Sequence, residues 1–216
     1  LVVLADNGFF FLLVWELMSL LSYFLVVTEH EKAEVRYAGL FYLIMTHVGT
    51  AFILLTFIIF FQAGGSFAFD TFRHPEQPLP ESMKTIAFLL ALVGFGTKAG
   101  IVPLHVWLHY AHPAAPSHIS ALMSGVMIKT AIYALIRVYF DFLGGQFPWW
   151  WGFVVLVIGA VSALLGVMYA LMEHDLKSLL AYHSVENIVI ILLGSWAGMI
   201  FQTYGFKEFA ALGLLA

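Results

Sequence analysis

Two lysines, each inside a long apolar run, are the residues of this chain best suited to chemistry. Lys98 and Lys129 enclose a stretch with four histidines and three prolines. The apolar runs on both sides are long enough to cross a bilayer, so both amines are expected at membrane depth, where a charge is costly and usually marks a function. Because neutral imidazole donates through one nitrogen and accepts through the other, lysines interspersed with histidines indicate a route for protons. The histidines of the stretch are His105, His109, His112 and His118.

Two carboxylates add to this predicted proton path. Glu16 lies near the middle of the first apolar run, and Glu186 follows His183 by three residues, so that these last two side chains can share a helical face. A carboxylate near a buried lysine favours the charged form of the amine. We expect Glu16 either to act on Lys98 in this way or to do no more than neutralise it. The secondary candidates for the path are His109, His112, His183 and Glu186.

Helical spacing relates the two lysines to His105 and His118, which we predict to be relays. His118 and Lys129 are eleven residues apart, about three α-helical turns, so an unbroken helix would stack them on one face. Proline removes a backbone donor and clashes with the preceding turn, so the helix that carries Lys98 is expected to break between Gly100 and Pro103. Non-helical backbone at membrane depth is tolerated only inside protein or beside a water-filled cavity, which also favours a hydrated path.

The composition indicates that these residues lie in membrane-spanning helices. Hydrophobic residues make up 62% of the 216 residues, charged residues make up 10%, and the mean hydropathy is +0.95. A soluble domain carries about 25% charged residues. A net charge of −4 without a basic block argues against a nucleic-acid partner. The absence of cysteine excludes disulfides and cysteine-ligated iron–sulfur clusters in this chain.

Six apolar segments approach or exceed the roughly 20 residues needed to cross the hydrocarbon core, and a seventh opens at Tyr204. The sequence therefore predicts an all-α fold, a polytopic transmembrane helix bundle. Residues 1–5 are expected to be the tail of an earlier helix and residues 63–80 a polar loop. The predicted spans are 9–27, 37–62, 81–112, 117–140, 150–172 and 178–201.

Three ordered motifs resemble a known family. The segment KAGIVPLHVWLHYAHPAAPSHISALMSGVMIKTAIYALIR, which begins at Lys98, resembles the signature of the antiporter-like proton-translocating subunits of respiratory complex I and its relatives. Within this superfamily the sequence of the motif is most similar to that of the large membrane subunit of formate hydrogenlyase and hydrogenase-4 type complexes. The segments VWELMSLLSYFL and HDLKSLLAYHSVEN fit the same subfamily, so the resemblance covers nearly the whole chain.

The resemblance implies residue roles and an architecture. It makes Glu16 and Lys98 an input pair and Lys129 a central lysine, whereas His109 stands where the family usually has proline. Such subunits are built from two inverted five-helix repeats, an arrangement found in many transporters. This chain is then a fragment of a longer subunit and forms a single transmembrane domain. Residues 1–140 would hold the first repeat and residues 149–216 the start of the second.

The function implied by the resemblance is that of a non-catalytic, ion-translocating subunit of an oxidoreductase complex. It would conduct protons or Na⁺ in the inner membrane of a bacterium or archaeon, beside other integral membrane subunits and a peripheral hydrogenase arm. No cofactor is expected in this chain, because the nickel–iron and iron–sulfur centres would belong to partner subunits.

Other functions remain open from the residues. Subunits of complex I and of multisubunit Na⁺/H⁺ antiporters share the same motifs, and an inert scaffold for the redox arm would also be apolar. A membrane di-iron enzyme is a remote alternative, since His105, His109 and His112 have the spacing of one histidine box. Such enzymes need several boxes, and no second cluster of that density is present.

Overall fold

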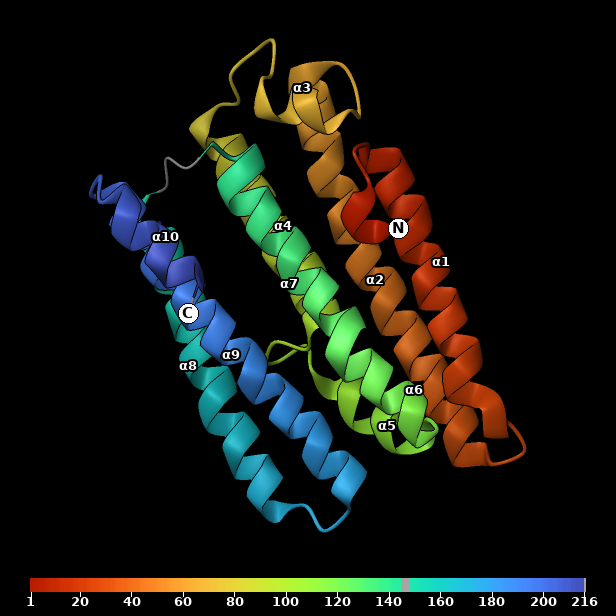
Figure 1. The fold of residues 1–216 in the computed structure, drawn as a ribbon. Coiled ribbons are helices and arrows are strands. Elements are labelled where there is room, and N and C mark those ends of the chain that lie inside the picture. The colour runs from red at the N-terminus through yellow and green to blue at the C-terminus, as the bar shows by residue number, and fades with distance from the viewer. Residues whose placement is uncertain (145–147, 216) are drawn as a thin grey trace.

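The computed structural model describes residues 1–144 and 148–215. Over these residues the regular elements are helices, apart from one isolated β-bridge between Asn7 and Ala68. Six of the helical segments are long and apolar enough to cross a membrane, and Figure 1 shows the long helices running side by side. The predicted all-α polytopic bundle is therefore confirmed.

The helix bounds agree with the predicted spans to within a few residues. The long helices are α1 (Gly8–Val26), α2 (Ala33–Gly64), α4 (Glu81–Ala99), α8 (Trp149–Met172) and α9 (Leu176–Thr203). The fourth span is composite, with α6 (Ser117–Leu122), a π-helical turn η3 (Met123–Met127), α7 (Ile128–Ile136) and a second π-helical turn η4 (Arg137–Phe142). The remaining elements are η1 (Val2–Leu4), η2 (Val27–Glu29), α3 (Phe69–Arg73), α5 (Val106–Ala114) and α10 (Lys207–Leu215).

The predicted break in the third span is confirmed. Helix α4 ends at Ala99 because Gly100 adopts a left-handed conformation with a φ of 78°, and its N–H bonds back to carbonyls of the last turn. A side chain at Gly100 would also collide with Leu108, since a Cβ there would lie 2.0 Å from Leu108 Cδ1. The chain resumes as α5 at Val106, so a non-helical segment separates the two halves of the span.

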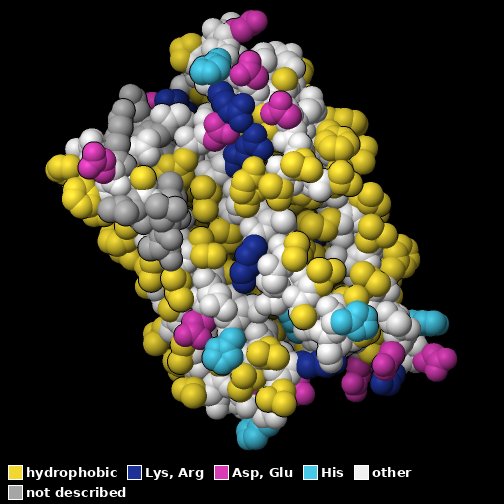
Figure 2. Space-filling view, in the orientation of Figure 1, with side chains coloured by type: hydrophobic (Ala, Val, Ile, Leu, Met, Phe, Trp, Pro, Cys, Tyr) yellow, Lys and Arg dark blue, Asp and Glu magenta, His cyan; other side chains and the backbone are white. Residues whose placement is uncertain are grey.

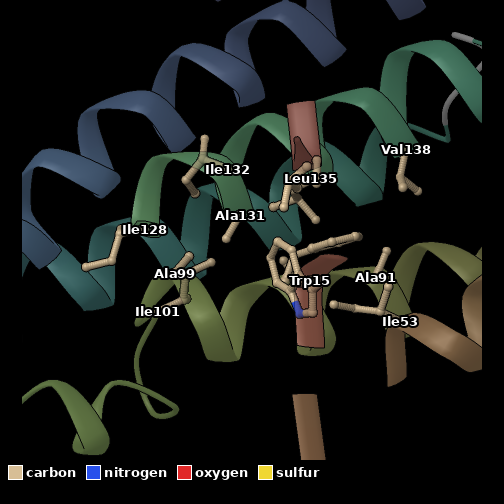
Figure 3. Close-up of a cluster of buried hydrophobic side chains, with 14 of the residues drawn as sticks. Trp15, Ile53, Ala91, Ala99, Ile101, Ile128, Ala131, Ile132, Leu135 and Val138 are labelled. Atoms are coloured by element: carbon tan, nitrogen blue, oxygen red, sulfur yellow. The ribbon is translucent and has the colours of Figure 1, made fainter. Parts of the chain in front are cut away.

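The core lies where α1, α2, α4 and α7 meet. Figure 3 shows Trp15 of α1 among buried side chains that include Ile53 of α2 and Ala91 of α4. The Trp15 ring packs edge-on against Phe95, with ring centroids 5.5 Å apart, an arrangement that adds to the stabilisation from burial. Helices α2 and α4 approach closely at glycine, because a Cβ at Gly94 would lie 2.9 Å from the Gly49 carbonyl oxygen.

The loop predicted at residues 63–80 contains a short helix, α3, so the expectation of an irregular polar loop is wrong in part. Phe69 and Phe72 of α3 are fully buried, and both contact the rings of Phe57 and Phe142. Burial of two aromatic side chains offsets the entropy of ordering the segment. The loop is thus fixed onto the upper end of the bundle in Figure 1.

Charged side chains gather at the two ends of the bundle, and Figure 2 shows a mainly apolar face between them. At the upper end, Arg73 donates two hydrogen bonds to Asp141, at 2.7 and 3.0 Å, and Arg137 donates a third at 3.3 Å. At the lower end, Asp175 caps α9 by accepting from the backbone N–H of Ser178 at 2.9 Å. The six helical segments that are apolar and long enough to cross a membrane extend between these two ends (Figure 1).

Candidate functional site

Lys98 is enclosed at the centre of the bundle, in the last turn of α4. Its side chain is 2% exposed, and its Nζ donates to Ser19 Oγ at 2.7 Å and to Tyr42 OH at 3.0 Å. The amine also lies 5.1 Å from the ring centroid of Tyr42 and 5.8 Å from that of Trp15. Its immediate partners are therefore neutral hydroxyls and aromatic faces, which stabilise an ammonium less than a carboxylate would.

The two hydroxyl partners are fixed by their own helices. Ser19 of α1 donates to the carbonyl of Trp15 at 3.0 Å, which leaves the lone pairs of its oxygen for Lys98. Tyr42 of α2 donates to Met127 Sδ at 3.5 Å, in the π-helical turn of the fourth span. Because both hydroxyl protons are used elsewhere, both oxygens face Lys98 as acceptors. Helices α1, α2 and η3 thus position one amine together.

Glu16 is paired with His47 rather than with Lys98 within the described residues. Its Oε2 lies 3.3 Å from His47 Nε2, and the two side chains are 27% and 50% exposed. His47 Nδ1 lies 2.9 Å from the Leu43 carbonyl oxygen, which can only accept, so this nitrogen carries a hydrogen. Nε2, the nitrogen that faces the carboxylate, is the one left to exchange a proton, as a relay requires.

The partners of Lys98 and the Glu16–His47 pair both lie on helices α1 and α2. Glu16 and Ser19 are three residues apart on α1, and Tyr42 and His47 are five apart on α2. The expected direct contact of Glu16 with Lys98 is thus replaced by two neighbouring groups, one around the amine and one around the carboxylate.

Lys129 occupies a different environment. It is half-buried in α7, and in the part of the chain that the structure describes its ammonium makes neither a hydrogen bond nor an ion pair. His118 is exposed near the start of α6. The predicted stacking of these two residues assumed an unbroken α-helix and is wrong in that assumption, because the π-helical turn between them takes up an extra residue and changes the register.

The remaining histidines of the stretch lie on α5 or directly before it. His112 is 1% exposed, and its Nδ1 lies 2.6 Å from Ser120 Oγ. His105 and His109 both face Tyr182 of α9, with ring centroids 6.4 and 5.6 Å from it. His109 Nδ1 is also 3.6 Å from a carboxylate oxygen of Glu173.

Helix α9 contributes two further contacts. His183 and Glu186 form an exposed pair on α9, with Nδ1 and Oε2 3.0 Å apart, so their predicted proximity is confirmed. Ser124 of the π-helical turn and Ser184 of α9 join the fourth and sixth spans through hydroxyls 2.5 Å apart. Among the described residues, no three histidine or carboxylate side chains come together as a metal would require, so the spacing of the histidine box does not become a metal-binding cluster.

Sequence reasoning missed Tyr42 and Glu173, and at His47, whose side chain is 50% exposed, it favoured a hydrogen-bonded core residue over a relay. Tyr42 and His47 both lie in the central part of a predicted span, and this polar placement at membrane depth is the signal that could have identified them. Glu173 follows α8 in a short polar connection, where a carboxylate is unremarkable. Its relation to α5 arises only in the folded chain.

Comparison with known proteins identifies the relatives of this chain. The profile of the family described as "NADH:quinone oxidoreductase/Mrp antiporter, TM" matches residues 5–214. The chain is 45% identical over 214 residues to hydrogenase-4 component B of Escherichia coli, and 35% identical over 213 residues to formate hydrogenlyase subunit 3 of the same organism. Each alignment covers 99% of this chain, but only 31% and 33% of those proteins. The chain therefore spans about a third of the length of these curated relatives.

A solved structure has the same fold. A chain in the Mrp complex from Dietzia sp. DQ12-45-1b superposes with a TM-score of 0.78 and 26% sequence identity, covering 98% of this chain and 41% of the other. The six apolar helices and the family profile together make this a multi-pass membrane protein.

Proposed function

This chain belongs to the NADH:quinone oxidoreductase/Mrp antiporter transmembrane family, and we propose that it is part of the ion-translocating membrane subunit of a hydrogenase complex of the formate hydrogenlyase or hydrogenase-4 type. The subunit conducts protons across the inner membrane of a bacterium or archaeon. Its partners are other integral membrane subunits and a peripheral hydrogenase arm, whose nickel–iron and iron–sulfur centres carry out the redox reaction. Residues 1–140 form the first of two inverted repeats, and residues 149–216 begin the second.

The observation that carries this proposal is that Lys98 hydrogen-bonds to two neutral hydroxyls and, among the described residues, pairs with no carboxylate. Both Ser19 and Tyr42 accept from the amine, and an amine that only donates keeps these bonds whether it is charged or neutral. A carboxylate in direct contact would instead hold the proton on the lysine. Lys98 can therefore gain and lose a proton without rearrangement of its neighbours.

The Glu16–His47 pair supplies the input to this amine. In this proposal a proton enters and leaves the pair at His47 Nε2, which faces the carboxylate, and the net charge of the pair changes each time. A change of charge beside the low-dielectric centre of the bundle alters the stability of the ammonium of Lys98. Lys129 is the next acceptor, with His105 and His118 as relays. A redox event in the partner subunits is coupled to translocation through these charges.

The proposal is tested on the complete complex in sealed vesicles, by measuring proton translocation beside hydrogen evolution in detergent. Lys98→Ala, Glu16→Gln and Lys129→Ala are each expected to lower translocation at least tenfold and to leave hydrogen evolution measurable. Lys84→Ala is the matched control, because Lys84 lies on the same helix as Lys98 but pairs with Glu81 near its start. Translocation at the wild-type rate in all three variants would refute the proposal, and would instead support a scaffold role.

A second candidate is a subunit of a multisubunit Na⁺/H⁺ antiporter, which is favoured by the likeness to a chain of the Mrp complex. Replacement of Na⁺ by K⁺ in the vesicle experiment separates the two. A proton-translocating hydrogenase subunit works equally well in both salts, whereas an antiporter stops without Na⁺.

A further inference from the structure

An open cavity of about 750 Å³ lies at the lower end of the bundle, between the start of α2, the end of α5 and the start of α9. Its volume is enough for on the order of twenty water molecules. Charged and aromatic side chains surround it, and the lining includes Lys32, Glu34, Tyr37, His109, Tyr110 and Lys177. The cavity borders the end of α5, which is the second half of the broken span.

His109 stands at the wall between this cavity and the protein interior. Its side chain is 36% exposed, yet its Nδ1 is buried and has no hydrogen-bond partner among the described residues. That nitrogen lies 3.6 Å from Oε1 of Glu173, which is 25% exposed. Most buried polar atoms in proteins are hydrogen-bonded, so a buried ring nitrogen that faces a carboxylate without a hydrogen bond calls for an explanation. Here the ring is placed to carry a proton from an open side toward a half-enclosed carboxylate.

Three further titratable rings lie beside His109, of which Tyr182 is buried, His105 is half-buried and Tyr169 is exposed. His105 lies one helical turn earlier, and its Nδ1 is also buried without a hydrogen-bond partner in the described chain. The Tyr182 ring is 5.6 Å from the ring of His109 and 6.4 Å from that of His105. Tyr169 stacks on Tyr182 at 5.5 Å and lies 6.2 Å from His105. Two imidazoles and two phenols thus connect the cavity wall with the break in the third span.

The charged and titratable groups around His109 are unevenly distributed. The carboxylate of Glu173 is the one in ion-pair distance, while the Lys177 amine is directed to the carbonyls of Pro113 and Ala115, at 3.4 and 2.9 Å. An imidazolium at this position therefore has an anionic partner, while the Lys177 amine is bonded to backbone carbonyls. The titratable groups beside His109 in the third, fifth and sixth spans and the connection after α8 are His105, Tyr110, Tyr169, Glu173, Lys177 and Tyr182. Near the start of α2, Glu29, Lys32, Glu34 and Tyr37 line the same cavity.

We infer that His109 and Glu173 form the proton-uptake pair of this subunit, through which protons pass from the aqueous cavity to the His105–Tyr182 cluster. This inference rests on the proposed function and names the ion as the proton. His109 accepts a proton from water in the cavity and becomes an imidazolium, which Glu173 stabilises. The ring then releases a proton inward, so one proton enters and one leaves, and no electrons move.

The test uses the complete complex in sealed vesicles, with 4-methylimidazole as the probe. His109→Ala opens space beside the cavity and removes the uptake group, so translocation is expected to fall about tenfold and to be partly restored by millimolar 4-methylimidazole. His174→Ala, an exposed histidine beside Glu173, is the matched control and is expected to translocate normally with or without the probe. His109→Gln keeps about the volume of the side chain and leaves no space for the probe, so it is expected to lose translocation without rescue. This variant tests the uptake group even if the alanine variant fails to assemble.

Glu173→Gln supplies an independent readout. Without the carboxylate, the imidazolium of His109 is less stable, so the pH at which translocation falls is expected to move to a more acidic value. A merely structural contact would lower the rate at every pH without moving the profile.

The outcomes separate this inference from the proposed function. If Lys98→Ala abolishes translocation while His109→Ala keeps the wild-type rate at every pH, the uptake role of His109 and Glu173 is wrong, and the proposed translocation function is supported. Loss of translocation in His109→Ala without rescue, together with an unmoved pH profile in Glu173→Gln, also overturns the inference. Full translocation in Lys98→Ala contradicts the function itself.

Discussion

Lys98 and Lys129 share a local sequence pattern but occupy opposite environments. Each follows a glycine by four residues, Gly94 in one case and Gly125 in the other. A Cβ at Gly94 would lie 2.7 Å from Ile53 Cγ1, whereas a Cβ at Gly125 would meet nothing within 4 Å. The first lysine is sealed between helices and held by two hydroxyls, while the second is half-buried and unbonded within the described residues.

The environment of a lysine at membrane depth is therefore set by the helix packed against it and not by the sequence of its own segment. Close contact of α4 with α2 fixes the position of the Lys98 amine relative to Tyr42. The open surface beside Lys129 leaves its long side chain several rotamers. In the proposed path, Lys98 is therefore a fixed relay and Lys129 an adjustable one.

Among the substitutions that test the difference between the two lysines, overpacking at Gly94 is expected to have the largest effect. In Gly94→Val, the new side chain collides with Ile53 and the Gly49 carbonyl, so α4 must move away from α2 and Lys98 must move away from Tyr42. Overpacked cores lose about 1–3 kcal/mol, and we expect the upper part of this range as well as a loss of translocation. The thermal stability of the purified complex in detergent measures the first effect.

Gly125→Ala is the matched control for this substitution. Because space is open at Gly125, we expect its stability to stay within about 0.5 kcal/mol of the wild type. Equal destabilisation by both variants would mean that the two lysines are packed alike, which is contrary to the structure.

Removal of a single hydroxyl sharpens the comparison at Lys98. Tyr42→Phe deletes one of the two acceptors of the amine, and a hydrogen bond to a charged group contributes about 1.5–3 kcal/mol. A tenfold fall in the translocation rate is expected, measured in sealed vesicles. Tyr139→Phe removes a buried hydroxyl that has no hydrogen-bond partner in the described chain, so this control should translocate at the wild-type rate and be no less stable.

Arg73, at the charged upper end of the bundle, contrasts with the two lysines inside the spans. Hydrogen bonds from Arg73 to Asp141 raise the pKa of the guanidinium, so this charge is permanent. Arg73→Gln is expected to cost about 0.2–1 kcal/mol, as partly exposed ion pairs do, and to leave translocation unchanged. A parallel measurement of melting temperature and translocation checks both parts. A variant that melts normally but fails to translocate would assign Arg73 to the path.

The smallest effect is expected at the cap of α9, where it depends on pH. The backbone N–H of Ser178 lowers the pKa of the exposed Asp175 carboxyl by donating to it. The cap therefore stabilises the helix above the ordinary carboxyl pKa of about 4, and this contribution is lost as the pH falls through the lower, folded value. Asp175→Asn should lower the melting temperature slightly at about pH 7 and not at about pH 3. Asp70→Asn, at an exposed site, should change it at neither pH.

The spans and the break could be predicted because they depend on local chemistry. Hydropathy over about 20 residues identifies a span, and Gly100 with Pro103 identifies where the helix cannot continue. The same reasoning placed Lys98 at membrane depth. It also failed locally at α3, because the burial of Phe69 and Phe72 depends on a groove formed by other helices.

The contacts of the site could not be predicted because helical periodicity gives one face of one helix at a time. It does not say that α2 brings Tyr42 to Lys98 or His47 to Glu16. The π-helical turn before Lys129 is a second case, since one extra residue in a turn leaves no mark in the hydropathy pattern.

The bridge between Ser124 and Ser184 differs from every ion pair in that neither partner carries a charge. The Ser184 hydroxyl donates to the Leu180 carbonyl at 3.0 Å, so its oxygen accepts from Ser124. Two parts of the chain that lie 60 residues apart are thus joined by a neutral contact with a defined direction. This seam between the fourth and sixth spans stays closed whether or not the neighbouring ionisable groups change charge.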